Sequence, residues 1–352
     1  MRVLARVTEV LGAQAIGMAD SYGLVDNVLA QPRHFRDALR RVEGLTLEKR
    51  DRAGGMLVCG MGGSAIGADL ARAAIGPRAR RPIRTVREYA PDPWLGPDTL
   101  VVCASYSGNT EETLAAYAAA GAAGADRVAV TTGGKLAAAA AADGVPVLEI
   151  PGGLQPRAAV AYMTAAMLEC AWRCGAAARP HGEIIATADL LESLGQDWGP
   201  DAPEHSDAKA LALALHGLVP VIYGAGSTGP VAFRWKAQIN ENAKSHAFCA
   251  ELPEADHNEI CAWERADGRF AAVLLDDGAL PPRMERRVEL TAGLVAATGA
   301  PMRRVYARGE LPLQRVMSLV FLGDLVSIYL AALDGIDPTP VEQIERFKRA
   351  LG

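Results

Sequence analysis

The sequence lacks an excess of charge of either sign. Its 36 Lys and Arg residues are balanced by 41 Asp and Glu residues, and these charges are spread along all 352 residues. Nucleic-acid-binding domains instead gather basic side chains on one face or one helix. We therefore expect no nucleic-acid partner, and no spare basic helix-turn-helix segment is present.

Cysteine is scarce, and its spacing fits neither a metal site nor a disulfide scaffold. All six cysteines lie within or beside apolar segments: Cys59, Cys103, Cys170, Cys174, Cys249 and Cys261. We therefore expect no metal ion and a reducing, cytoplasmic setting. Two nucleotide-binding patterns are also missing, because there is no G-x-x-x-x-G-K-[ST] and no clean G-x-G-x-x-G.

Long uninterrupted apolar runs are missing as well. Arg6 and Glu9 break the apolar stretch at the start of the chain, which we interpret as a soluble helix or a frayed extension. The apolar stretch 313–333 is interrupted by polar residues, and we expect it to be a helix buried between domains or subunits. No association with a membrane is expected.

Half of the residues are apolar, and they form short strand-like runs that alternate with helical patterns. Such runs occur at 56–60, 99–104, 128–130, 146–150, 219–225, 269–276 and 301–308. This alternation predicts an α/β protein with parallel, doubly wound sheets. The stretch MLVCGMGGSAIGADLARAAI resembles the later VPVIYGAGSTGPVAFRWKAQI, which indicates two related domains. We place them at 1–155 and 201–352, joined by helices at 156–200.

Two loops after predicted strands have the composition of a phosphate site. In GMGGS, from Gly60, the glycines allow a sharp turn and let a ligand approach the amides before the next helix. In SYSGNT, Ser105, Ser107 and Thr110 surround Gly108. Open α/β sheets bind ligands where such loops meet, at the carboxyl edge. A purely structural alternative is a glycine turn in the first loop and a helix cap by Thr110 in the second.

At this point the motifs resemble a known family. GMGGS and SYSGNT resemble the phosphate loops of the sugar isomerase (SIS) fold. NENAK, EADHNEI, PRAA and DPTPVEQIERFK resemble the bifunctional phosphoglucose/phosphomannose isomerases. The motifs extend from about residue 56 to the end of the sequence, so the resemblance covers nearly the whole chain and implies two SIS domains.

The resemblance implies a role for each matching residue. Gly63, Ser64, Ser105, Ser107 and Thr110 match the phosphate-binding positions. Glu241 matches the base that moves a proton between C2 and C1 through a cis-enediol, and Arg157 matches the cation that stabilises the enediolate. His257 and Lys348 match the pair that opens the sugar ring, with the histidine contributed by the other subunit of a homodimer. No cofactor is implied.

General chemistry agrees with these roles, although each residue has a simpler alternative. A proton next to a carbonyl is weakly acidic, so its removal needs a positioned base and a cation near the developing oxyanion. Imidazole suits ring opening because its pKa is near neutral. Taken singly, however, Glu241 and Lys348 are ordinary helix charges, Arg157 is a residue at a helix start, and His257 is a turn residue that hydrogen-bonds to Glu254 or Asp256.

Two further positions refine the hypothesis. In the second domain, Asp276 and Asp277 stand where the first domain has its serine loop, and carboxylates repel a phosphate. We therefore predict one phosphate site per chain. Val341 lies seven positions before Lys348. The resemblance implies that glucose-only members of the family have glutamine at this place, and that a smaller residue here allows mannose 6-phosphate as well. Valine cannot hold a water molecule as a hydroxyl can, so we expect mannose 6-phosphate to be a poorer substrate than glucose 6-phosphate.

The sequence thus predicts an aldose–ketose isomerase that interconverts glucose 6-phosphate and fructose 6-phosphate, with mannose 6-phosphate as a further substrate. Two alternatives stay open. One is a phosphosugar isomerase that acts on an amino sugar or a heptose. The other is a non-catalytic protein that senses a phosphosugar.

Overall fold

A computed structural model describes residues 10–351. The chain forms two compact units. The first-sheet unit contains residues 30–191 and 309–317, and the second-sheet unit contains the described residues up to 29 together with 192–308 and 318–351. Two long helices, α9 (His181–Trp198) and α13 (Pro312–Leu333), each contribute residues to both units.

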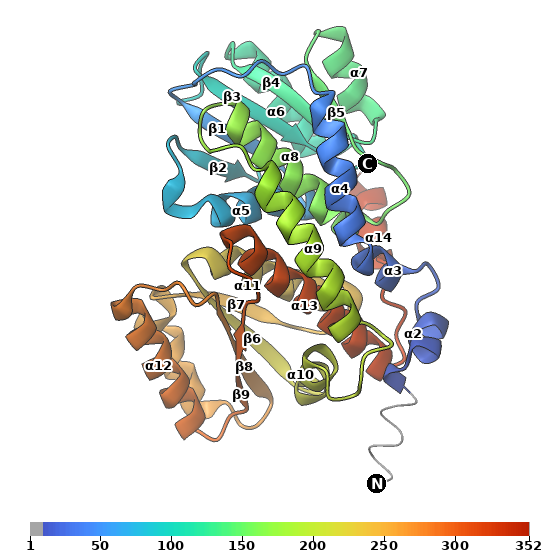
Figure 1. The fold of residues 1–352 in the computed structure, drawn as a ribbon, viewed down its shortest axis with the longest axis vertical. Coiled ribbons are helices and arrows are strands. Elements are labelled where there is room, and N and C mark those ends of the chain that lie inside the picture. The colour runs from blue at the N-terminus through green and yellow to red at the C-terminus, as the bar shows by residue number, and fades with distance from the viewer. Residues whose placement is uncertain (1–9, 352) are drawn as a thin grey trace. The chain divides into compact units, whose positions relative to one another are not determined.

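The first-sheet unit has five parallel strands in the order β2-β1-β3-β4-β5 (Figure 1). Their bounds are Ile83–Val86, Gly55–Gly60, Thr99–Ala104, Asp126–Thr131 and Val147–Glu149. The central strands β1 and β3 are buried along their whole length, as expected for strands covered on both faces. The predicted parallel, doubly wound fold is therefore confirmed for this unit.

Helices cover both faces of this sheet. On one face, α6 (Glu111–Ala122) and α7 (Gly134–Ala142) pack against alternate strand residues, among them Leu57, Val101 and Cys103. On the other face lie α5 (Gly62–Ile75), α8 (Val160–Arg173) and α4 (Gln31–Glu43), and α8 packs against both α5 and α4 (Figure 1). The chain reverses its winding direction between β1 and β3, so their following loops diverge at this point.

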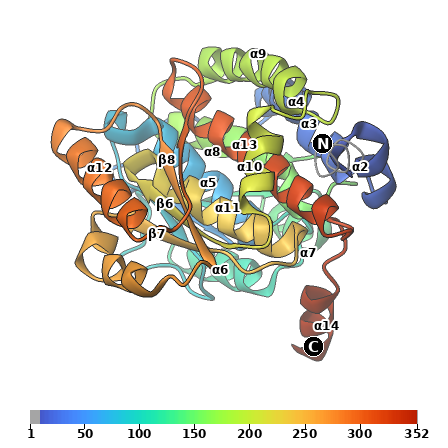
Figure 2. The same cartoon turned by 90° about the horizontal axis from the view of Figure 1, so that it is seen from below.

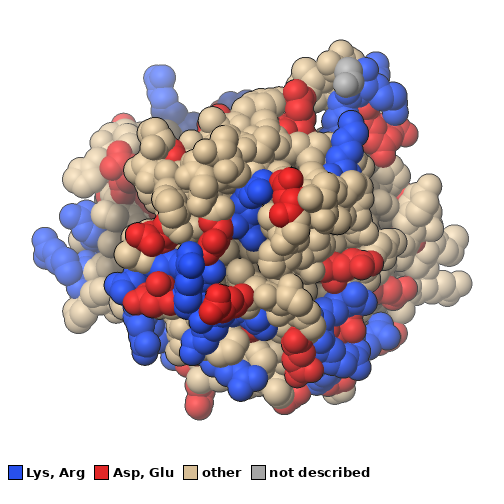
Figure 3. All heavy atoms as spheres, turned by 90° about the horizontal axis from the view of Figure 1, so that it is seen from above, with Lys and Arg blue, Asp and Glu red and all other residues tan. Residues whose placement is uncertain are grey.

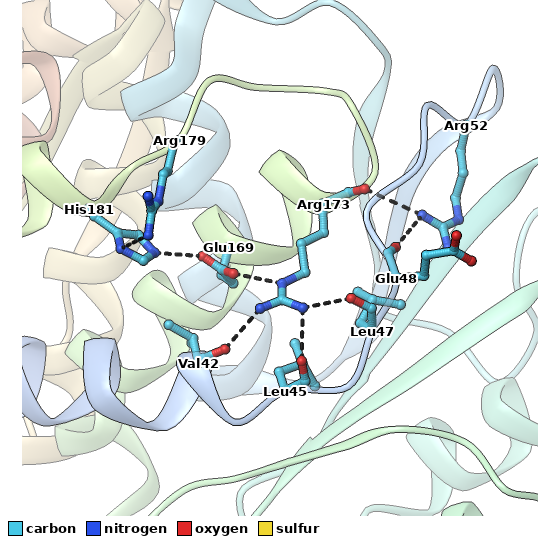
Figure 4. Close-up of polar contacts among 9 residues, drawn as sticks. All are labelled: Val42, Leu45, Leu47, Glu48, Arg52, Glu169, Arg173, Arg179 and His181. Carbon is cyan, nitrogen blue, oxygen red and sulfur yellow. Dashed lines mark hydrogen bonds and ion pairs between the residues drawn. The ribbon is translucent and has the colours of Figure 1, made fainter.

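A buried ionic cluster fixes α8 (Figure 4). Glu169 is 1% exposed and accepts a 2.7 Å hydrogen bond from Arg173 Nε. Arg173 also donates to three backbone carbonyls, of Val42, Leu45 and Leu47. His181 Nδ1 lies 3.1 Å from Arg179, which can only donate, so its Nε2 carries the proton that faces Glu169. The cluster ties α8 to the end of α4, and α8 begins directly after the segment that carries Arg157.

The second-sheet unit has four parallel strands in the order β7-β6-β8-β9. Their bounds are Phe248–Leu252, Val219–Ala225, Phe270–Asp276 and Met302–Tyr306. α12 (Pro282–Ala297) packs beside β8 and β9, and α11 (Gly229–Asn242) packs on β6 and β7 (Figure 1). The sheet repeats the switch in winding direction, here between β6 and β8, which is consistent with the prediction of two domains of one type.

The remaining helices of this unit are short, apart from α13. They are α2 (Ala13–Ala19), α3 (Leu24–Leu29), α10 (Asp207–Leu215) and α14 (Glu342–Leu351). Figure 2 shows α14 at the end of the segment that follows α13. By length and composition α13 is able to cross a membrane, but 94% of its apolar window is buried in the protein, which is the environment of a core helix. Its burial agrees with the prediction of a buried helix, whereas the expectation that polar residues interrupt it too often for a membrane span is wrong.

Surface charge is mixed. Figure 3 shows Lys and Arg side chains interspersed with Asp and Glu side chains over one face of the molecule. Exposed ion pairs also occur on the surface, such as Arg50 with Asp126 and Arg81 with Asp51. A face of this kind lacks the single sign of charge that binds a nucleic-acid backbone.

Candidate active site

The two predicted phosphate loops lie at one edge of the first sheet. β1 and β3 are parallel neighbours, so the loops that follow them both emerge at the carboxyl edge, at the switch in winding direction. α5 begins without a side-chain cap on its first flanking residue, Met61, so amides of its first turn are left for other partners. The N-terminus of a helix also attracts anions through its dipole. This edge therefore has the geometry of a phosphate site.

Hydroxyl groups line these loops and contact one another. Ser105 Oγ lies 2.8 Å from Thr110 Oγ1, and Ser64 Oγ accepts a 3.1 Å hydrogen bond from the Tyr106 amide. Ser64 and Ser105 are buried, whereas Ser107 is exposed. Thr110 does flank the start of α6, but its side chain makes no capping bond, so the prediction that its hydroxyl caps the helix is wrong. The hydroxyl instead turns toward Ser105.

The close approach of two chain segments requires Gly63. A Cβ atom built on Gly63 would lie 2.7 Å from the Pro156 carbonyl oxygen and 3.2 Å from Cα of Arg157. The first phosphate loop is therefore in backbone contact with the short helix Pro156–Ala159 that carries Arg157. Arg157 is 4% exposed, and its guanidinium lies 3.4 Å from Gln155 Oε1. The structure thus brings Gly63, Ser64, Ser105, Thr110 and Arg157 together in one unit.

Tyr106 is a residue of this site that the sequence did not single out. Its hydroxyl donates to the Pro151 carbonyl (3.0 Å) and accepts from the Leu154 amide (2.8 Å). Burial raises the pKa of Tyr106, so the phenol stays neutral and able to donate. Through its amide and its hydroxyl, Tyr106 joins the second phosphate loop to Ser64 and to the segment that leads to Arg157. The one signal in the sequence is an aromatic residue inside a loop of small polar residues.

The other predicted residues lie in the second-sheet unit. Glu241 occupies the last turn of α11 and is half-buried. Buried polar contacts fix the orientation of α11 about its axis relative to α13. Arg234 of α11 and Asp324 of α13 form a bidentate ion pair, and both side chains are nearly inaccessible to solvent. Asn242, next to Glu241, donates a 2.8 Å hydrogen bond to Ser327 Oγ. These directional contacts fix the helix end from which Glu241 projects.

His257 ends a short helix, Glu254–His257, and is exposed. Asp256 accepts from Thr291 (2.7 Å) and lies 3.4 Å from Arg287, while Glu254 accepts from Asn258. Among the described residues neither of these carboxylates bonds to His257, so the alternative of a turn histidine held by Glu254 or Asp256 is not what the structure contains.

Lys348 and Val341 belong to the C-terminal segment. Lys348 lies in the last turn of α14, a helix with no buried residues, and Val341 directly precedes that helix. Lys348 is exposed, as expected for a lysine near a helix C-terminus. No direct contact among Glu241, His257 and Lys348 is seen within the described residues, so their roles rest on the resemblance.

In the second sheet, the loops that follow β6 and β8 correspond to the predicted phosphate loops, and their polar side chains bond to groups of the same unit. Ser227 donates to the Asp277 carboxylate, and Asp276 accepts from the Gly278 amide and from Arg304 Nε (2.8 Å). Two carboxylates at this edge oppose a phosphate. Among the described residues no group of three His, Cys, Asp or Glu side chains has the arrangement of a metal site.

Comparison with known proteins agrees with this geometry. Residues 204–351 match the family model of the bacterial phospho-glucose isomerase C-terminal SIS domain. Two relatives carry the name bifunctional phosphoglucose/phosphomannose isomerase. The protein from Caldicellulosiruptor bescii is 40% identical over 84% of this chain and 89% of its own, and that from Aquifex aeolicus is 35% identical over 84% and 90%.

Solved structures show the same fold at low sequence identity. A hypothetical protein from Thermus thermophilus aligns over 100% of this chain and 95% of its own, with a TM-score of 0.73 and 18% identity. Tagatose-6-phosphate ketose/aldose isomerase from Escherichia coli aligns over 91% and 96%, with a TM-score of 0.68 and 17% identity. The curated relatives match most of the chain in sequence as well as in domain type, and this protein therefore belongs to the bifunctional phosphoglucose/phosphomannose isomerase family.

Proposed function

We propose that this protein is an aldose–ketose isomerase that interconverts glucose 6-phosphate and fructose 6-phosphate, and that it also accepts mannose 6-phosphate. One observation carries the proposal: the hydroxyl-lined loops meet at the switch point of the first sheet, with buried Arg157 in backbone contact with Gly63. The names of the curated relatives support the substrate class.

In this proposal the first-sheet unit binds the phosphate. Ser64, Ser105, Ser107 and Thr110 donate from their hydroxyls, and the amide of Gly63 donates from the start of α5. A phosphate monoester accepts several such hydrogen bonds, and the helix dipole favours its charge. Ser105 and Thr110 already lie 2.8 Å apart, so they reach one phosphate with little rearrangement.

The proposed proton transfer uses one carboxylate, Glu241, and one guanidinium, Arg157. Glu241 removes the proton next to the carbonyl of the open-chain sugar and returns it to the neighbouring carbon, so the substrate passes through a cis-enediol with no net gain of protons. The Arg157 guanidinium stabilises the developing oxyanion. Its burial strengthens this effect, because electrostatic interactions are less screened away from water.

Ring opening requires one proton on the ring oxygen and the loss of another from the anomeric hydroxyl. We assign these transfers to His257 and Lys348, and we propose a homodimer in which His257 acts in the active site of the other subunit. The exposure of His257 supports this assignment, because the side chain is available to a neighbouring chain. Light scattering tests the dimer, since particles of only 37.0 kDa contradict it.

Val341 bears on the choice of sugar. A side chain smaller than glutamine leaves room for rotation about the C2–C3 bond, which is needed to present either face of the carbon to Glu241. Valine offers no hydrogen bond to a water molecule, however. We therefore expect a lower kcat/KM for mannose 6-phosphate than for glucose 6-phosphate.

The decisive experiment replaces Glu241 with glutamine. We expect kcat for fructose 6-phosphate in a coupled assay to fall by about 10²-fold or more, because the general base is removed. Glu264, an exposed residue of the same unit, provides the matched control: Glu264→Gln keeps wild-type kcat. A Glu241→Gln protein within a few fold of wild type contradicts the mechanism.

A second candidate has its own supporting observation. A protein named D-glucosamine-6-phosphate 4-epimerase, from Sulfolobus acidocaldarius, is 32% identical over 66% of this chain. The family framework is thus compatible with amino-sugar phosphates. A panel of glucose, mannose and glucosamine 6-phosphates separates the two functions, and turnover of glucosamine 6-phosphate alone favours the second. Binding of the panel without turnover favours a sensor.

We also propose a cytoplasmic location. All six cysteines, which lie within the described residues, are free thiols, and four of them are buried. Burial raises the pKa of Cys59 to about 12, so this thiol resists oxidation by remaining protonated. Free thiols of this kind suit a reducing compartment.

A further inference from the structure

Lys244 has an unusual backbone conformation directly after the helix that carries Glu241. α11 ends at Asn242, Ala243 is its capping residue, and Lys244 follows with φ of 55°. Glycine is the common residue at this position, because a side chain in the left-handed region costs about 1 kcal/mol or more. The chain accepts this cost at a lysine, which points to a role for its side chain.

The Lys244 ammonium group binds three backbone carbonyls. Two belong to the end of α11, those of Glu241 (2.6 Å) and Asn242 (3.3 Å). The third belongs to Pro338 (3.1 Å), which lies in the segment between α13 and α14. An ammonium group has three donors, and a cation is also favoured at a helix C-terminus. Lys244 thus joins the end of α11 to a segment 94 positions away.

The same segment is held from its other side. Thr339 donates to Asp20 Oδ1 (3.2 Å), and Ser21 donates to the Asp337 carboxylate. Thr339 is 2% exposed. Residues 337–339 are therefore fixed at two places, and Val341 and α14 follow directly.

We propose that Lys244 is a positioning residue. It holds Glu241 at a fixed place relative to the segment that carries Val341 and leads to Lys348. This inference rests on the proposed function, in which these residues act on one sugar. Because the ammonium donates to carbonyls of both segments, we assign it a geometric role. Its loss removes one of the two anchors of residues 337–339 and loosens the last turn of α11, while the predicted phosphate loops stay unchanged.

Lys244→Met is the direct test, because methionine keeps the aliphatic stem and loses the donors. We expect kcat for fructose 6-phosphate to fall about tenfold with KM within about twofold, since the reacting groups are displaced and the phosphate site is kept. Amide hydrogen exchange should rise in peptides covering 337–345. Lys244→Gly is the second variant: it relieves the backbone strain, so it should fold at least as stably and show the same kinetic loss.

The control is Lys236→Met on the same helix, where the ammonium lies 5.8 Å from the Phe233 ring and contacts no part of the 337–341 segment in the described structure. It should keep wild-type kcat and exchange. If Lys244→Met and Lys244→Gly both keep wild-type kcat and exchange while Glu241→Gln is inactive, the inference is overturned and the proposed function stands. If Glu241→Gln is fully active, the proposed function itself fails.

Discussion

Alanine at Gly63 tests whether the first phosphate loop positions Arg157. The added Cβ would lie 2.7 Å from the Pro156 oxygen and 3.0 Å from the Pro156 carbonyl carbon. Non-bonded carbon and oxygen atoms stay near 3.2 Å or more, so the two backbones must separate by about 0.5 Å. No side-chain rotation relieves the contact, because both groups are backbone. We expect the free energy of unfolding to fall by about 1–3 kcal/mol, the usual cost of overpacking.

The kcat of Gly63→Ala should fall even though most of the protein stays folded. Displacing a reacting group by about 1 Å can lower the rate by about 10²-fold. The backbone shift expected here is about 0.5 Å or more, so we expect kcat to decrease by about 10- to 100-fold. The assay couples glucose 6-phosphate formation to its oxidation by a dehydrogenase. Denaturant unfolding in the same buffer measures stability and shows that the variant is folded during the assay.

Gly67→Ala is the matched control for this experiment. Its Cβ would lie 2.6 Å from the Met163 Cβ, an overlap of similar size on the same helix, but against α8 rather than against Pro156. We expect a similar loss of stability with kcat within about threefold of wild type. Equal losses of kcat in the two variants would mean that any distortion of α5 inactivates the enzyme. An unaffected kcat in Gly63→Ala would show that the loop does not position Arg157.

Three further predictions concern neighbouring groups. Tyr106→Phe removes two hydrogen bonds to the segment before Arg157 and should lower kcat about 3- to 10-fold with little change in melting temperature, measured by the same assay and by calorimetry. Burial, with a smaller contribution from Arg33, lowers the pKa of His34 to about 4, so the unfolded chain binds the extra proton as pH falls from 6.5 to 4. The free energy of unfolding is therefore highest above pH 6.5 and declines below it by up to about 3 kcal/mol, a value that solvent screening of this partly exposed side chain reduces. Urea unfolding of His34→Phe should lack this loss at acid pH. The prediction is refuted if the free energy of unfolding falls equally steeply with decreasing pH in His34→Phe and in wild type. Glu169→Gln leaves the Arg173 charge without its partner and should cost about 3 kcal/mol by denaturant unfolding, whereas a cost below about 1 kcal/mol would show that the pair is dispensable.

Central strands were predictable from the sequence, whereas two edge strands were not. β1 and β3 are continuous apolar runs because both of their faces are buried. β2 and β7 sit at sheet edges, where most residues are partly exposed, so their sequences carry no strong strand pattern. Neither of these two strands was predicted.

The candidate site divides in the same way. The location of Ser105, Ser107 and Thr110 was predictable, because a loop that follows a buried strand must emerge at the carboxyl edge of a parallel sheet; their role in binding phosphate stays a prediction. The pairing of Thr110 with Ser105, in place of a helix cap, was not predictable. A hydroxyl at a helix start has both options, and only the folded path of its own loop, which brings Ser105 within reach, selects between them.

The sequence by itself determined the parallel architecture, the place of the predicted phosphate loops and the resemblance to the isomerase family, because these depend on local patterns along the chain. Tertiary structure alone decided which distant segments meet. It placed Gly63 against Pro156 and the Lys244 ammonium on the Pro338 carbonyl. Such contacts depend on how the helices pack against the sheets, and they produce no periodic pattern in the sequence from which they could be predicted.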